Sequence, residues 1–74
     1  MTAIDRLNRI RDSHTAIVEE REIRYTTEQG LLAREASSRY AVADARMALE
    51  YARIELEKAE IALLEYSKHF PKGD

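Results

Sequence analysis

The feature that most constrains this chain is a long apolar stripe in its C-terminal half. From Ala41 to Phe70, apolar residues recur at steps of three and four, which places them on one face of an α-helix. The stripe consists of Ala41, Ala45, Ala48, Ala52, Leu56, Ala59, Leu63, Tyr66 and Phe70. Because so wide an apolar face is unstable in water, the pattern predicts a long helix whose stripe packs against other helices.

A second set of apolar residues in the same stretch lies away from the first stripe. Tyr40, Met47, Ile54 and Ile61 are spaced by seven residues and lie among charged ones. A helix with a single neighbour shows one apolar stripe and a charged back. The pattern therefore predicts a second contact, made either with another copy of the chain or with a different protein. The alternative is that these four are isolated surface residues, which need no partner.

The composition indicates a small helical protein that needs additional burial to be stable. The chain has 74 residues, 35% charged and 45% hydrophobic, with two Gly, one Pro and no Cys. One core of this size rarely supplies more than about 3–5 kcal/mol. Without Cys, neither disulfides nor zinc–thiolate sites can add to it. Oligomerisation is the remaining way to bury more surface and gain stability, so we expect a homo-oligomer, most simply a dimer.

The first helix has a clear start and an unclear end. Thr2 and Asp5 have the spacing of a capping box, in which each side chain accepts a hydrogen bond from the other residue's amide. The apolar pattern is lost between Tyr25 and Gly30. We therefore predict the first helix over residues 3–25.

The second helix is predicted over residues 29–70. Ser37 and Ser38 mark a second place where the chain could bend. Pro71 disfavours helical geometry in the residue before it, so residues 71–74 are expected to form a short polar tail.

These signals together predict a single all-helical domain over residues 1–74. We expect an all-α helical hairpin of two long antiparallel helices, the second longer, which assembles into a dimeric helical bundle or coiled coil. The alternative is one uninterrupted helix, because a single Gly costs a helix only about 1 kcal/mol relative to Ala.

The residue types needed for catalysis or metal binding do not come together in the sequence. Gly30 and Gly73 are the only glycines, and neither lies in a nucleotide-binding pattern. Ser67 and His69 are two residues apart on a helix and point to different sides. Glu65 and His69 could share one metal, but two ligands near a helix end make a weak site. We expect no enzymatic activity, no cofactor and no metal.

Charge and hydropathy argue against nucleic-acid binding and membrane insertion. The net charge is −2, and Arg6, Arg9 and Arg11 are the only local excess of positive charge. A helix–turn–helix module would show more basic charge and shorter helices. No apolar run approaches 18 residues, and the N-terminus lacks the apolar core of a secretory signal. We expect no membrane span and a cytoplasmic location.

These observations favour a non-enzymatic module for protein–protein interaction. Such a module would be a small adaptor, regulator, inhibitor or chaperone-like protein that presents an apolar helix face to its partner. Two alternatives remain from the sequence, a structural rod built as a parallel coiled coil and a small helical nucleic-acid-binding regulator.

Overall fold

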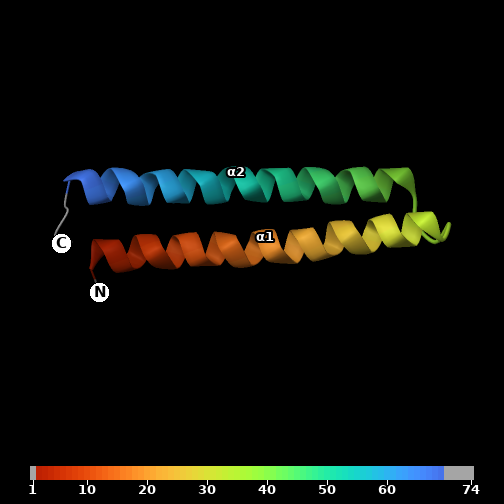
Figure 1. Cartoon of the computed structure of the whole chain (residues 1–74), viewed down its shortest axis with the longest axis horizontal. Coiled ribbons are helices and arrows are strands. Elements are labelled where there is room, and N and C mark those ends of the chain that lie inside the picture. Colours follow the sequence, from red (N-terminus) through yellow and green to blue (C-terminus); the bar gives the residue numbers. More distant parts are fainter. Residues whose placement is uncertain (1, 70–74) are drawn as a thin grey trace.

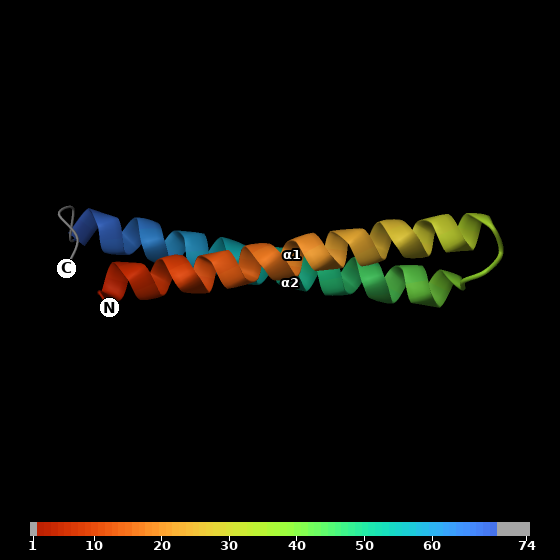
Figure 2. The ribbon, with the colours of Figure 1, turned by 90° about the horizontal axis from the view of Figure 1, so that it is seen from below.

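Two antiparallel helices make up the computed structural model, which describes residues 2–69 (Figure 1). α1 spans Ala3–Ala33 and α2 spans Arg39–His69, and each has 31 residues. The helices lie side by side and cross near their middles in the view from below (Figure 2). The predicted all-α hairpin is confirmed, although the helices are equal in length where a longer second one was expected. Phe70 and the predicted tail over residues 71–74 lie outside the described residues.

α1 begins where the sequence predicts. The Asp5 amide donates a hydrogen bond to Thr2 Oγ1 at 3.2 Å, and the Thr2 amide donates to Asp5 Oδ2 at 3.4 Å. These two bonds form the reciprocal capping box and satisfy two amides that have no partner within the helix. Asp5 also places a negative charge in the first turn, where the helix dipole favours it.

The predicted end of the first helix near Tyr25 is wrong, because α1 continues to Ala33. The physical reason is packing against α2. Tyr25 packs against the hydrophobic core, and Leu32 is half-buried. These contacts outweigh the cost of about 1 kcal/mol for Gly30 inside a helix. The predicted start of the second helix at residue 29 is wrong for the same reason.

The chain reverses at residues 34–38, between the two helices. The Ala36 amide donates to the Leu31 carbonyl at 2.8 Å, and the Glu35 amide donates to the Leu32 carbonyl at 2.9 Å. This pair of bonds is a Schellman motif, which requires a left-handed residue after the helix. Glu35 is that residue, with a φ of 60°.

Ser37 and Ser38 complete the turn. The Ser37 hydroxyl donates a hydrogen bond to the Glu28 carboxylate, which ties the turn to the last part of α1. Ser38 caps α2, because its Oγ accepts a hydrogen bond from the Ala41 amide at 3.0 Å. The bend that the sequence allowed at residues 37–38 is therefore part of the reversal between the helices.

A regular row of α2 residues faces α1, and we call these residues the seam. They follow one another at steps of three and four, large and small side chains alternate as far as residue 63, and all are buried or half-buried. The seam consists of Val42, Ala45, Leu49, Ala52, Leu56, Ala59, Leu63 and Tyr66. Ala41 and Ala48, which the predicted stripe includes, are half-buried beside it. Small residues in alternate positions allow the two backbones to approach closely.

α1 contributes fewer apolar groups to this contact. Val18 is the only buried residue among its described positions. Arg11, His14 and Arg21 are half-buried at helical spacing from Val18, so the side of α1 that faces α2 is partly polar. The core is therefore small and depends mainly on α2.

Candidate protein-interaction face

The seam determines which side of α2 points away from α1. Three exposed residues of α2 share the same offsets from the seam, and these are Met47, Ile54 and Ile61. Each lies five positions after a large seam residue and two positions after a seam alanine. These offsets turn the helix by about 140° and about 200°. Tyr40 continues the same row one step earlier. We call these four residues the outer row, because it lies opposite the contact with α1.

The outer row is exposed along its whole length. The exposed fractions are 84% for Tyr40, 50% for Met47, 47% for Ile54 and 51% for Ile61. The sequence predicts these residues as an interface that α1 does not cover. The structure places all four on one side of α2 and leaves that side open.

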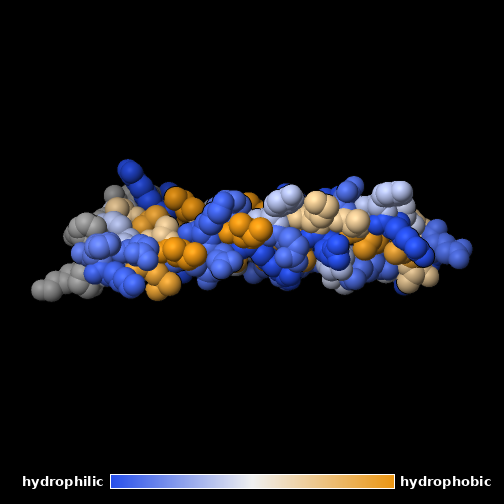
Figure 3. Space-filling model, turned by 90° about the horizontal axis from the view of Figure 1, so that it is seen from above, coloured by the Kyte–Doolittle hydropathy of each residue, from blue (hydrophilic) through white to orange (hydrophobic). Residues whose placement is uncertain are grey.

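Two further apolar side chains widen this side of α2. Tyr51 follows Met47 by four positions, Leu64 follows Ile61 by three, and they are 63% and 65% exposed. We call the outer row with these two residues the outer face. The view onto α2 shows hydrophobic side chains recurring along the rod, separated by hydrophilic ones (Figure 3). Sequence analysis missed Tyr51 and Leu64 because neither belongs to the seven-residue row.

Charged residues surround the outer face and are partly paired. Arg53 Nη1 lies 3.3 Å from Glu50 Oε1, and Arg53 Nη2 lies 3.6 Å from Glu22 Oε1 on α1. Lys58 Nζ lies 3.3 Å from Glu55 Oε1. Each side chain is half-exposed or more, so each pair stabilises the hairpin by only about 0–1 kcal/mol. The pairs bound the apolar surface without covering it.

The hairpin as a whole exposes more surface than a compact domain of its mass. Its accessible surface is 5743 Å², whereas a compact chain of 8.6 kDa is expected to expose about 4,700 Å². The difference, roughly 1,000 Å², is similar to the area of about 800 Å² that each partner buries in a standard interface. α1 adds to this surface with Ile10, Ile17 and Ile23, which are also exposed.

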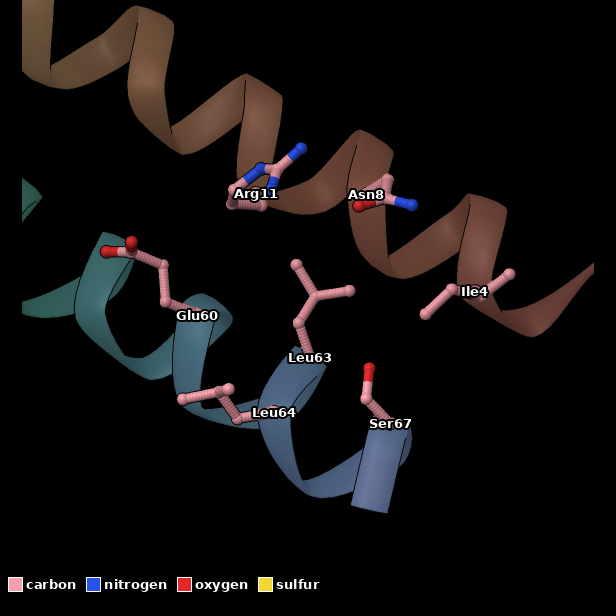
Figure 4. Close-up of a pocket in the computed structure, with 7 residues that line it drawn as sticks. All are labelled: Ile4, Asn8, Arg11, Glu60, Leu63, Leu64 and Ser67. Atoms are coloured by element: carbon pink, nitrogen blue, oxygen red, sulfur yellow. The ribbon is translucent and has the colours of Figure 1, made fainter. Parts of the chain in front are cut away.

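A hollow lies between the helices near the end of the hairpin where the two termini lie (Figure 4). Its walls come from both helices and include Asn8, Arg11 and Glu60. The Arg11 guanidinium is paired with Asp12 on its own helix at 3.0 Å. The polar groups therefore do not converge on one point, as a catalytic or small-molecule site requires.

The described residues hold no group of three or more His, Asp or Glu side chains close enough to bind a metal ion. Over the same part of the chain, neither helix is long and apolar enough to cross a membrane. No protein-family model, curated protein or solved structure matches the chain. What the protein does must therefore be argued from the geometry of the hairpin and its outer face.

Proposed function

We propose that this protein is a non-enzymatic module for protein–protein interaction, of the kind found in small adaptors, regulators, inhibitors and chaperone-like proteins. The observation that supports the proposal best is the outer row. Four large apolar side chains recur at a spacing of seven on the side of α2 opposite α1, and 47% or more of each is exposed. A surface helix with one neighbour normally carries charged residues on this side.

The spacing favours a helical partner. A strict seven-residue repeat keeps a row of side chains in contact with another helix over several turns, as in a coiled coil. Tyr40 and Ile61 are 21 residues apart, which corresponds to about 32 Å of helix. A contact of this length would add a second neighbour to α2, and a helical bundle is the resulting assembly.

The small core supports the same proposal. Within residues 2–69, the buried side chains are Val18 and Leu49 together with three alanines. Burial of a large apolar side chain contributes about 1.5–3 kcal/mol. A partner that binds only the folded hairpin would stabilise it further by mass action. The simplest such assembly is a homodimer. A cytoplasmic setting is part of this proposal, since a chain without Cys makes no use of an oxidising compartment.

The hairpin does not favour the parallel coiled-coil rod. The chain reverses at residues 34–38, and the longest dimension of the structure is 54 Å. An uninterrupted helix of this chain would be about 100 Å long. The nucleic-acid alternative gains no support from α2, because its described arginines alternate with glutamates such as Glu50 and Glu57.

The proposal is tested by placing a charge in the middle of the outer row. Ile54→Asp should reduce association at least ten-fold, because it removes apolar contact and forces a carboxylate into a desolvated interface. Association would be measured by sedimentation of the protein and by capture of proteins from a cell extract on the immobilised chain. Circular dichroism should show unchanged helicity.

Ile23→Asp is the matched control, because Ile23 is 69% exposed and lies on α1, away from the outer face. It should associate as the original protein does. If Ile54→Asp sediments like the original protein and captures the same proteins, the outer face is not an interaction surface.

A further inference from the structure

The charges beside the outer face have an ordered arrangement along α2. On one edge, Asp44, Tyr51 and Lys58 follow one another at steps of seven, so Tyr51 lies midway between an acid and a base. On the other edge, Arg46 lies toward the start of the helix and Glu57 toward its end. Reversing the direction of α2 therefore exchanges positive and negative charge on both edges.

A surface with this arrangement is complementary to itself when it is turned end over end. We propose that the partner of the outer face is a second copy of this chain, packed with its α2 antiparallel to the first and with the two-fold axis at Tyr51. The inference rests on the proposed function, because it assumes that the outer face binds protein. It adds the identity of the partner, its direction and its register.

The apolar side chains fit this register. With the axis at Tyr51, Met47 of each copy lies within one residue, about 1.5 Å along the helix, of Ile54 of the other. Tyr40 lies equally close to Ile61 of the other copy. The two Tyr51 rings meet at the axis, where an aromatic pair is favourable. All four members of the outer row then contact an apolar side chain from the second copy.

The charged side chains fit it as well. In an antiparallel pair, each edge of α2 faces the same edge of the second copy. Asp44 therefore lies opposite Lys58 of the second copy, and the two-fold symmetry forms this pair twice. Arg46 approaches Glu57 of the second copy on the other edge. A parallel pairing would bring unlike edges together, with Asp44 near Arg46 of the second copy and the two Tyr51 rings on opposite edges. Only the antiparallel pairing joins the two Tyr51 rings. Electrostatic complementarity of this kind favours a second copy as the partner, and the meeting of the Tyr51 rings favours the antiparallel direction.

Cysteine cross-linking tests the orientation directly, because the chain has no Cys of its own. Helix axes about 8–10 Å apart, with Cα atoms about 2.3 Å from each axis, bring the two Tyr51 Cα atoms within the range of about 4.4–6.8 Å that a disulfide spans. The two Tyr40 Cα atoms would be about 33 Å apart. Tyr51→Cys should therefore form a disulfide-linked dimer under mild oxidation, and Tyr40→Cys should not.

An equimolar mixture of Tyr40→Cys and Ile61→Cys should form a mixed disulfide dimer, because the register brings these positions together. If Tyr40→Cys alone forms the dimer, the pairing is parallel and the inference is overturned, while interaction through the outer face still stands. If no variant cross-links and the original protein sediments as a single chain, a second copy is not the partner. The Ile54→Asp capture experiment then decides separately whether the outer face binds another protein.

Charge exchange gives an independent readout. Asp44→Lys alone should raise the dimer dissociation constant roughly ten-fold, because two weak ion pairs become two repulsions. Adding Lys58→Asp to the same chain should restore the original affinity, because each pair is re-formed with its charges exchanged. If the double variant binds as weakly as the single one, or the single one as tightly as the original, the proposed register is wrong.

Discussion

At the scale of single residues, Gly30 lies where a residue with a side chain would be more stable. It is inside α1 and exposed, and a Cβ atom built there meets nothing within 4 Å. Gly30→Ala should raise the free energy of unfolding by about 1 kcal/mol, because Ala restricts the unfolded chain and favours the helix. Urea unfolding followed by circular dichroism, at one fixed protein concentration, measures the change. A loss of stability would mean that α1 does not continue as a helix through this glycine.

Glu35 presents the opposite case, because it occupies a conformation that favours glycine. Its φ of 60° lies in the left-handed region, which costs a residue with a Cβ about 1–2 kcal/mol. Glu35→Gly should therefore stabilise the hairpin by about 1 kcal/mol in the same urea experiment. Glu19→Gly, an exposed helical position of α1, should destabilise it by a similar amount. Equal effects at the two positions would contradict the Schellman turn.

At the scale of the helices, the central leucine of the seam carries much of the core. Leu49 is 2% exposed and clusters with Val18 and Ala52. Leu49→Ala should cost about 2–5 kcal/mol, which is as large as the whole stability expected of a core this small. The variant should lose most of its helical circular dichroism at 25 °C. Leu64→Ala, the same change at a 65% exposed position, should remain helical, and equal helicity of both variants would contradict the seam.

The sequence predicted the helices better than it predicted the turn. The Thr2–Asp5 box predicted the start of α1 correctly, because capping depends on neighbouring residues alone. The reversal was expected too early, because the polar residues before Gly30 resemble a break. Whether they remain helical depends on contacts that Tyr25 makes with α2, and these contacts are not local in sequence.

The candidate interface was predicted in part. The outer row was found because its spacing of seven is regular against a charged background. Leu49 was missed as a packing residue because Ala48 continues the step from Ala45 equally well, and a helical pattern leaves a choice between adjacent positions. Only the position of α1 decides that Leu49 faces inward. The row through Val42, Leu49, Leu56 and Leu63 was the sequence signal that could have identified it.

At the scale of the whole molecule, the hairpin is too extended to bury much of its own surface. Its radius of gyration is 16.6 Å, compared with about 11 Å for a compact domain of the same length. An elongated pair of helices has no third layer to cover the outer face, so burial of that face requires another polypeptide. We expect the proposed dimer to be more stable than the isolated hairpin, with unfolding midpoints that rise with protein concentration.

The most direct test of this account is sedimentation equilibrium of the unmodified protein over a range of concentrations from micromolar to millimolar. We predict that the weight-average mass rises from the chain mass of 8.6 kDa toward twice that value, as the proposed binding of a second copy to the outer face requires. A folded, helical protein whose mass stays at that of one chain up to millimolar concentration would contradict the account.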